Sequence, residues 1–299
     1  MVAVAPRLTA ADVWWSAVRP ATLAASVAPV LAGTAIAVHG GGPRVSAGLL
    51  ALTVGVAMQL GVNFANDYSD FLRGADGASR IGPMRAASSG LVQAEHVRWA
   101  AIAAFGVAAV AGLVLSLITD PRLIAVGVAS LLAGWLYTGG PRPYGYLGLG
   151  EVFVFVFFGL VATVGTVYVE TLVVTPLAVV TGCALGCLAT AILVLNNLRD
   201  IDTDRAAGKR TLATRIGRTR TRALLVGLVC LAFVISIAIP ITRLAGLTVM
   251  LALFASPIAA AAIQIALATR SGPPLVRALR RMAMAELVYA LLFALGVLL

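Results

Sequence analysis

Long apolar stretches alternate with short polar segments along almost the whole chain. A helix that crosses the hydrocarbon core of a bilayer needs roughly 20 predominantly apolar residues. The pattern therefore predicts an all-α membrane protein, built as a bundle of about nine transmembrane helices. The nine apolar runs are 22–38, 45–62, 99–118, 123–137, 152–169, 172–195, 223–241, 244–269 and 282–299.

The composition supports this interpretation. Hydrophobic residues make up 61% of the chain and charged residues 11%, whereas a soluble domain is about half apolar and a quarter charged. No polar segment is long enough for a separate soluble domain, so we expect one transmembrane domain over residues 1–299. Trp14 and Trp15 precede the first run. Because tryptophan favours the membrane interface, we expect a short amphipathic helix there rather than a cleaved signal peptide.

The basic residues predict the orientation of the bundle. Of 22 Lys and Arg residues, only Arg44, Arg122 and Arg243 lie on one side of the predicted topology, and the other nineteen lie on the opposite side. The positive-inside rule places the N-terminus and the loops after even-numbered helices in the cytoplasm, and the C-terminus outside a plasma membrane. The net charge of +10 does not indicate nucleic-acid binding, because these residues lie between membrane helices. They suit anionic lipid headgroups or an anionic substrate.

Six of the eight aspartates fall in two clusters, and each cluster directly follows a long apolar run. Carboxylates beside hydrocarbon are costly, which indicates a function. A single carboxylate at a helix end is usually a solvated cap, but two such clusters with basic loops behind them are harder to explain as purely structural. The first cluster contains Asn63, Asn66, Asp67, Asp70 and Asp76, and the second contains Asn196, Asn197, Asp200, Asp202 and Asp204.

The two loops that carry the clusters share a pattern. Each begins with asparagine four residues before aspartate, and each later contains Arg-Ile-Gly, at 80–82 and at 215–217. The loops lie four predicted helices apart. This predicts two four-helix halves related by an internal repeat, plus a ninth helix, and such a repeat would bring both clusters to one side of a central cavity.

The helical spacing of the clusters suits a shared cation. Several carboxylates in one place repel one another unless a cation neutralises them, and oxygen ligands without His or Cys suit Mg²⁺. Asp202 lies off the shared face and is expected to point to solvent. The residues expected to share a face are Asn63, Asn66, Asp67 and Asp70 in the first cluster and Asn197, Asp200 and Asp204 in the second.

Basic residues downstream of each cluster, among them Arg80, Arg85 and Lys209, suit a diphosphate beside Mg²⁺. A diphosphate with a water-soluble partner needs no bilayer, whereas a polyprenyl diphosphate has a polyanionic head and an oily tail. Mg²⁺ and cationic side chains would stabilise the departing diphosphate. An apolar cavity would keep water from the resulting carbocation.

These motifs resemble the UbiA superfamily of intramembrane aromatic prenyltransferases, whose nine-helix bundle carries Asp-rich motifs after helices 2 and 6. The resemblance covers nearly the whole chain. Residues 66–85 and 137–151 are most similar to the branch that prenylates 1,4-dihydroxy-2-naphthoate in menaquinone synthesis. The matching motifs are Arg19-Pro20-x-Thr22-Leu23, Asn66-Asp67-Tyr68-x-Asp70 and Asp200-x3-Asp204-x3-Gly208-Lys209-x-Thr211-Leu212.

The resemblance implies an Mg²⁺-dependent transfer of a polyprenyl group from polyprenyl diphosphate to the naphthoate, with loss of CO₂ and diphosphate, giving demethylmenaquinone. The implied catalytic residues are Asp67, Asp70, Asp200, Asp204 and Lys209. The implied metal ligands are Asn66, Asp70, Asp200 and Asp204, with Asp67, Asp76 and Asn197 assisting. The implied substrate-binding residues are Arg80, Arg85 and Lys209 for the diphosphate and Arg142, Tyr137 and Asn63 for the aromatic acceptor or the allylic head.

Other functions stay open from the sequence. Within the family, the acceptor could be of the 4-hydroxybenzoate type, or a haem or chlorophyll precursor. Outside it, a divalent-cation transporter would also place acids in a helical bundle, but transport sites usually lie near the bilayer midplane. A phospholipid-type phosphotransferase is a third candidate, although it normally keeps its acids in one motif. Glu286 lies within the ninth apolar run and is expected to face the bundle interior, where it could pair with Arg280 or line the cavity. Glu151, near the start of the fifth run, leaves the same choice open.

Overall fold

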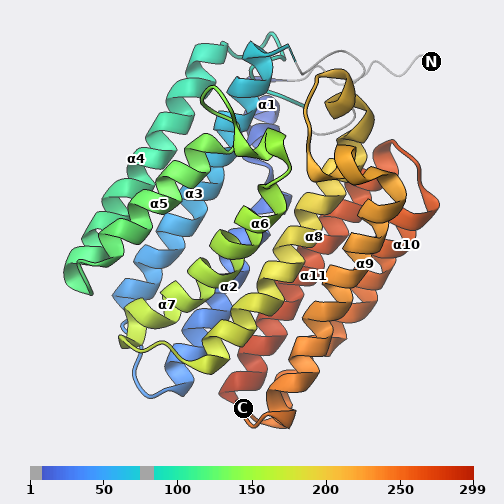
Figure 1. Cartoon of the computed structure of the whole chain (residues 1–299). Coiled ribbons are helices and arrows are strands. Elements are labelled where there is room, and N and C mark those ends of the chain that lie inside the picture. The colour runs from blue at the N-terminus through green and yellow to red at the C-terminus, as the bar shows by residue number, and fades with distance from the viewer. Residues whose placement is uncertain (1–8, 75–83) are drawn as a thin grey trace, which may run out of the picture.

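The computed structural model describes residues 9–74 and 84–299, and the regular structure in them is helical. Long helical rods lie side by side in one bundle (Figure 1). The all-α fold predicted from the apolar runs is therefore confirmed. The elements are α1 (Ala10–Val18), α2 (Pro20–His39), α3 (Val45–Leu72), α4 (Ala94–Ile118), α5 (Leu123–Leu136), η1 (Tyr144–Leu147), α6 (Gly150–Val154), η2 (Phe155–Val161), α7 (Ala162–Thr171), α8 (Pro176–Ala206), α9 (Leu212–Ile241), η3 (Leu247–Ala255), α10 (Ser256–Ala268) and α11 (Pro273–Leu298).

Eight helical segments among the described residues are long and apolar enough to cross a membrane, and α5 is a shorter apolar helix of 14 residues. Three of the spans combine neighbouring elements: α1 with α2, α6 with η2 and α7, and η3 with α10. The chain is thus a multi-pass membrane protein. The eight spans and α5 together follow the nine predicted runs, and α5 corresponds to the short fourth one.

Two predicted helix starts differ from the structure. The sixth run was expected to be helical from residue 172, but Leu172 has a φ of 61° and ends α7, and Thr175 caps the start of α8. The ninth helix was expected to start at residue 282, but α11 begins at Pro273. Its first turns present Arg277 and Arg280 on an exposed side while Leu279 is buried, so an amphipathic segment extends the apolar run.

The helix predicted around the tryptophan pair is α1. Its N-terminus is fixed by a reciprocal capping box between Thr9 and Asp12. Trp14 packs edge-on against Phe64 of α3, with ring centroids 5.8 Å apart, whereas Trp15 is exposed. Arg19 adopts a left-handed backbone conformation between α1 and α2, so the chain turns there before it enters the bundle.

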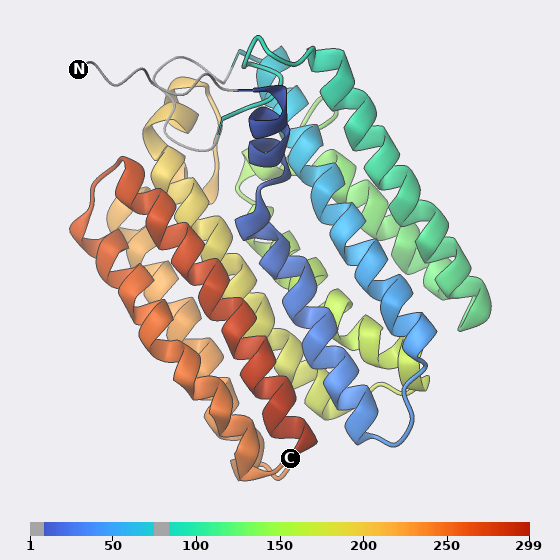
Figure 2. The same cartoon turned by 180° about the vertical axis from the view of Figure 1, so that it is seen from behind.

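The bundle is held together by two main hydrophobic cores and by a small cluster of Ala47, Leu115 and Val169. The larger one joins α2, α8, α9 and α11 to η3 and α10, largely through leucine and alanine; seen from behind, α2 and α11 run side by side (Figure 2). The smaller main core joins α1, α3 and α4. Glu286 is fully buried in α11, as expected for an intramembrane acid, and neither of its carboxylate oxygens has a hydrogen-bond partner among residues 9–74 and 84–299.

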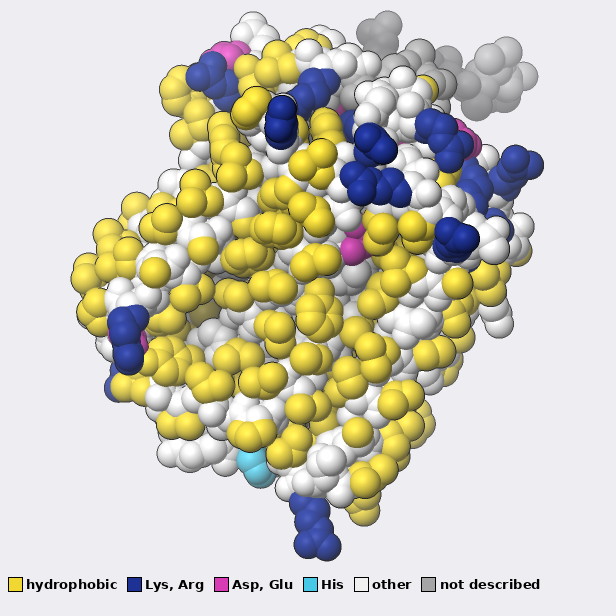
Figure 3. All heavy atoms as spheres, in the orientation of Figure 1, with side chains coloured by type: hydrophobic (Ala, Val, Ile, Leu, Met, Phe, Trp, Pro, Cys, Tyr) yellow, Lys and Arg dark blue, Asp and Glu magenta, His cyan; other side chains and the backbone are white. Residues whose placement is uncertain are grey.

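The polar loops gather at one end of the bundle. The connections α3–α4, α5–α6, α8–α9 and α10–α11 lie at the end of the bundle that carries α1, and the C-terminus lies at the opposite end (Figures 1 and 2). Lys and Arg side chains crowd this same end, and hydrophobic side chains cover the flank below it (Figure 3). This arrangement agrees with the loop assignment used for orientation. The division into two four-helix halves plus a ninth helix stays a prediction.

Candidate active site

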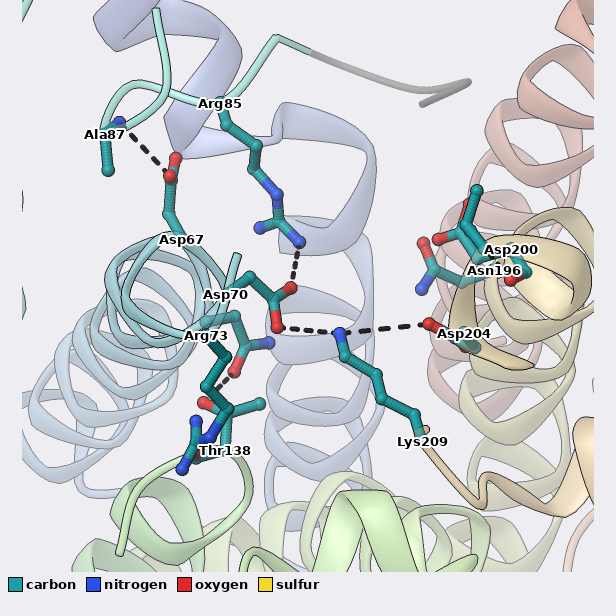
Figure 4. A network of polar contacts seen from close by, with 12 residues as sticks. Asp67, Asp70, Arg73, Arg85, Ala87, Thr138, Asn196, Asp200, Asp204 and Lys209 are labelled. Carbon is teal, nitrogen blue, oxygen red and sulfur yellow. Dashed lines mark hydrogen bonds and ion pairs between the residues drawn. The ribbon is translucent and has the colours of Figure 1, made fainter. Parts of the chain in front are cut away.

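The two acidic clusters face each other across a single lysine. Asp70 lies near the end of α3, Asp204 lies near the end of α8, and Lys209 reaches between them (Figure 4). The Lys209 Nζ atom is 2.7 Å from Asp70 Oδ1 and 3.8 Å from Asp204 Oδ1. Clusters that are far apart in sequence therefore form one site.

The turn after α8 positions this lysine. Gly208 has a φ of +72°, a conformation that side chains with a Cβ disfavour, and it follows directly on the end of the helix. The Lys209 amide then donates to the Asp204 carbonyl oxygen at 2.8 Å. The next amide, of Arg210, donates to the carbonyl oxygen of Tyr146 at 3.0 Å. The loop after α8 is thereby joined to the connection between α5 and α6.

Asp70 accepts hydrogen bonds on both of its carboxylate oxygens. It accepts hydrogen bonds from Arg85 at 2.7 Å, from Lys209 at 2.7 Å and from the Tyr146 hydroxyl at 2.6 Å. Burial, followed by the negative charge of Asp70, raises the pKa of Tyr146 above its ordinary value, so its hydroxyl stays a donor at neutral pH. Lys209 and Arg73 also lie over the Tyr146 ring, at 4.7 and 5.2 Å from its centroid.

Asp67 is bonded to the backbone of the loop that carries Arg85, and its catalytic role stays a prediction. It is fully buried and accepts hydrogen bonds from the backbone amides of Ala86 and Ala87, at 2.8 and 3.2 Å. In Figure 4 it points toward that loop and away from Lys209. Asp67 therefore holds the segment that carries Arg85. Arg85 in turn contacts Asp70.

In the second cluster, a neighbouring arginine is hydrogen-bonded to a residue that was expected to bind the metal. Arg199 donates through Nε and Nη2 to the two oxygens of Asp200, at 2.7 and 2.5 Å, and through Nη2 to Asn196 Oδ1 at 2.8 Å. Asn197 points elsewhere, because its amide nitrogen donates to Glu151 at 3.0 Å. Asn196 is therefore the amide that shares Arg199 with Asp200, and the assignment of Asn197 as a metal ligand stays a prediction.

Several remaining predictions can be placed. Asp202 is exposed and pairs with Arg218. Its exposure agrees with the expectation that it points to solvent. Asn66 accepts a hydrogen bond from the Thr138 hydroxyl at 2.7 Å. Arg142 is exposed and does not line the cavity described below. Asp76 and Arg80 lie outside the described residues.

An apolar cavity of about 460 Å³ lies beside these polar residues, between α2, α3, α4, α5, α8 and the α6–η2–α7 rod. Exposed Ile124 and Val126 of α5 belong to its wall, and Figure 3 shows a hollow in the hydrophobic flank. The cavity thus reaches the lipid-facing surface. Its polar lining includes Arg19, Thr22, Gln59, Asn63, Asn66 and Asn196, and its aromatic lining includes Tyr137, Tyr144, Phe153, Phe157 and Phe158.

The aromatic wall is ordered by ring contacts. Tyr144 stacks on Phe153 with centroids 3.9 Å apart, and Phe153 stacks on Phe157 at 6.0 Å. Tyr137 meets Tyr144 edge-on at 5.5 Å. The Tyr144 hydroxyl donates to the Ala133 carbonyl oxygen at 2.8 Å, which fixes the ring in the wall. Asn63 closes the polar end, where its amide donates to Thr22 and to the Val18 carbonyl oxygen.

The donor set of the site fits a magnesium ion. Within the part of the chain that the structure describes, no three acidic, His or Cys side chains form a ready metal cluster. The carboxylates of Asp70 and Asp200 are instead neutralised by Lys and Arg. Carboxylate and amide oxygens without sulfur or imidazole are the ligands of hard divalent cations. The Lys209 ammonium between Asp70 and Asp204 shows that this position attracts a cation.

Comparisons with known proteins agree with the predicted family and fold. The sequence profile described as the UbiA prenyltransferase family matches residues 26–284. The chain belongs to the UbiA prenyltransferase family. It is 45% identical to a 1,4-dihydroxy-2-naphthoate octaprenyltransferase of Mycobacterium tuberculosis, over 94% of this chain and 95% of that protein. It is 37% identical to the enzyme of the same name from Escherichia coli, over 76% of this chain and 77% of that protein.

Solved structures show the same fold. This UbiA prenyltransferase superposes with a TM-score of 0.64 on a UbiA homologue from Archaeoglobus fulgidus that was solved with GPP and Mg²⁺. The superposition covers 95% of this chain and 99% of that one, at 13% sequence identity. A UbiA homologue from Aeropyrum pernix K1 gives a TM-score of 0.63 over 95% of this chain and 97% of that one, also at 13% identity.

Sequence reasoning missed three parts of the prenyltransferase site. The sequence reasoning considered only the acids and amides of the second cluster and therefore missed Arg199. Its position three residues after Asn196 places it on the same helix face, which is the signal that could have found it. Tyr146 lies in a loop whose path depends on the contact with Arg210. The aromatic wall left only a weak signal in the sequence, namely the four-residue spacing of Phe153 and Phe157.

Proposed function

We propose that this prenyltransferase moves a polyprenyl group from polyprenyl diphosphate to 1,4-dihydroxy-2-naphthoate, with loss of CO₂ and diphosphate. The observation that carries the proposal is the position of Lys209, which lies between the acidic ends of α3 and α8 beside an apolar cavity open to the flank of the bundle. Such an arrangement separates a polyanionic head from an oily tail. Relatives that carry the naphthoate name cover nearly the whole chain.

The diphosphate head would lie among the residues that now pair with one another. Asp70, Asp200 and Asp204, with Asn66 and Asn196, would hold Mg²⁺, which supplies charge stabilisation for the departing diphosphate. Lys209 and Arg85 would turn from Asp70 to the phosphate oxygens. These cations reach the carboxylate at 2.7 Å, so they are close enough to serve the head without a movement of the helices.

The apolar cavity would receive the allylic end and the tail. Ionisation of the allylic C–O bond gives a carbocation, which must be kept from water until the acceptor attacks. The stacked rings of Tyr144, Phe153 and Phe157 line the cavity, and aromatic faces attract cations. The opening at the flank would let a long tail continue into lipid.

The acceptor would enter at the polar end of the cavity, which Arg19, Thr22 and Asn63 line. Arg19 is suited to the acceptor carboxylate, because a guanidinium matches a carboxylate with two parallel hydrogen bonds. The ring carbon that bears the carboxylate would attack the prenyl cation, and loss of CO₂ would restore aromaticity. The product is demethylmenaquinone, formed as its quinol. Tyr137, which also lines the cavity, would contact the ring.

The orientation of the site follows from charge. The end of the bundle that carries the site also carries most of the Lys and Arg side chains (Figure 3). By the positive-inside rule this end faces the cytoplasm of a plasma-membrane protein, and the C-terminus faces outward. Both substrates would then be reached from the cytoplasmic leaflet.

An activity assay in membranes tests the proposal. Membranes that contain the protein receive one prenyl diphosphate and either 1,4-dihydroxy-2-naphthoate or 4-hydroxybenzoate, and the products are identified by mass. We expect a decarboxylated prenyl naphthoquinol and no prenyl benzoate. A prenylated hydroxybenzoate would assign the alternative acceptor. Absence of any prenylated product, together with uptake of Mg²⁺ into liposomes, would favour a transporter instead.

A further inference from the structure

Arg199 occupies a place that the proposed function gives to a metal ion. Its side chain is only 3% exposed, and its ion pair with Asp200 uses both carboxylate oxygens. The same guanidinium contacts Asn196. Both carboxylate oxygens of Asp200 and the amide oxygen of Asn196 are thus bonded to a charge from the same helix.

Helix geometry accounts for this arrangement. Asn196, Arg199 and Asp200 are spaced i, i+3 and i+4 on α8, so they form one stripe. Asn196 lines the cavity, so the stripe faces the site. An arginine cannot lose its charge in a protein, and its planar fork matches carboxylates and phosphates equally well.

We propose that Arg199 is an internal counter-cation that changes partners during substrate binding. It neutralises Asp200 while the site holds no metal, and it moves to the diphosphate when Mg²⁺ and polyprenyl diphosphate enter together. The inference rests on the proposed function. It assigns Arg199 a positioning role at the site, because a divalent ion bound at Asp200 would be repelled by a guanidinium held at hydrogen-bond distance from the same oxygens.

The first cluster is built in the same way, which supports the inference. Asp70 is paired with Arg85 and Lys209, so both acidic motifs carry their own cations. Metal alone must displace a buried cation that then has no anion to pair with, and an unpaired buried charge is costly. A diphosphate provides that anion. Metal and diphosphate should therefore strengthen each other's binding, and such coupling is reciprocal.

Metal binding without turnover tests this role. The purified protein in lipid nanodiscs is titrated with Mn²⁺, and free Mn²⁺ is followed by electron paramagnetic resonance. Arg199→Gln removes the competing charge, so we expect Mn²⁺ alone to bind about tenfold more tightly than in the wild type. At saturating Mg²⁺, calorimetry should show about tenfold weaker binding of geranyl thiolodiphosphate, because one phosphate ligand is lost. Unchanged Mn²⁺ affinity, or unchanged affinity for the analogue, overturns the proposal.

Three variants make the outcome unambiguous. Arg199→Lys keeps the charge without the two-nitrogen fork, and its Mn²⁺ affinity should lie between those of the wild type and Arg199→Gln. If the Mn²⁺ affinity of Arg199→Lys is equal to or lower than that of the wild type, the role is overturned. This test holds even if Arg199→Gln does not fold. Arg205→Gln removes an exposed charge from the same helix end and should leave Mn²⁺ affinity within about threefold. Asp204→Asn should weaken Mn²⁺ binding. If it does not, the proposed metal site itself fails, which is distinguishable from failure of Arg199 alone.

Discussion

The Nζ atom of Lys209 lies 2.7 Å from Oδ1 of Asp70, although the two residues are 139 positions apart in the chain. This contact closes the site, because Lys209 follows the end of α8 and Asp70 lies near the end of α3. Through its neighbour Asp204, the same lysine belongs to the second acidic motif. One flexible cation thus connects both halves of the site and lies where the diphosphate would bind.

Replacement of Lys209 by alanine should reduce kcat/KM for the prenyl diphosphate by about 100-fold, because a charge that stabilises the leaving group is lost. The effect should appear as a raised KM, a lowered kcat or both in a membrane assay. Arg210→Ala is the matched control, since Arg210 is the next residue and its side chain is exposed. Equal losses in the two variants would mean that only general charge at this loop matters.

The sequence was sufficient to predict that the two clusters belong together, and the reasons are physical. Long apolar runs define the membrane spans, and the spacing of Asn66 and Asp70 puts them on one helix face. Sequence could not decide between Asn196 and Asn197, because adjacent positions differ by only about 100° around a helix and the contact with Glu151 that orients Asn197 comes from another element. Such long-range contacts appear only in the folded chain.

The loops were the least predictable part for the same reason. Tyr146 reaches Asp70 because η1 is held by the amide of Arg210, and neither contact leaves a pattern in the local sequence. Asp67 was expected to act with Asp70 because both share a face of α3. In the folded chain it accepts hydrogen bonds from the amides of Ala86 and Ala87, a contact that the local sequence did not predict.

Tyr146 offers a prediction that follows from these contacts. Tyr146→Phe keeps the ring beneath Lys209 and removes the hydroxyl bond to Asp70, so kcat/KM should fall about tenfold, the usual effect of one hydrogen bond to a charged group. Tyr146→Leu also removes the ring and should lower kcat/KM further. The control is Tyr168→Phe, because the Tyr168 hydroxyl likewise donates to an aspartate, Asp120, which lies in the α4–α5 connection. This connection lies at the opposite end of the bundle (Figure 1). A loss in Tyr168→Phe equal to that in Tyr146→Phe would contradict a role at the site.

The acidic residues should be required for turnover and dispensable for insertion. Asp70→Ala and Asp200→Ala should each abolish prenyl transfer while the protein still accumulates in membranes, because each removes a proposed ligand of Mg²⁺. Asp202→Ala should keep most of the activity, since Asp202 is exposed and pairs with Arg218. Near-normal transfer in either of the first two variants would reject the metal assignment.

Metal removal provides an independent measurement. Treatment of the membranes with EDTA should stop prenyl transfer, and added Mg²⁺ should restore it, because Asp70, Asp200 and Asp204 can only assist ionisation of a diphosphate through a shared cation. The product is again identified by mass. Full activity in thoroughly chelated membranes would count against the mechanism, whereas a loss that Mg²⁺ does not reverse would indicate damage to the protein.

Close packing of the α6–η2–α7 rod against α8 should limit side-chain size at Gly159. A Cβ at this position would meet Gly186 Cα and lie 2.7 Å from the Gly182 carbonyl oxygen, and backbone atoms cannot move aside as a flexible side chain can. Gly159→Ala should therefore destabilise the protein by about 1–3 kcal/mol, the usual cost of overpacking, measured as a lower Tm in detergent. Gly165→Ala, on the same rod with no atom within 4 Å of the added Cβ, should leave the Tm nearly unchanged. An equal Tm for both variants would show that α8 can shift away from the rod at little cost.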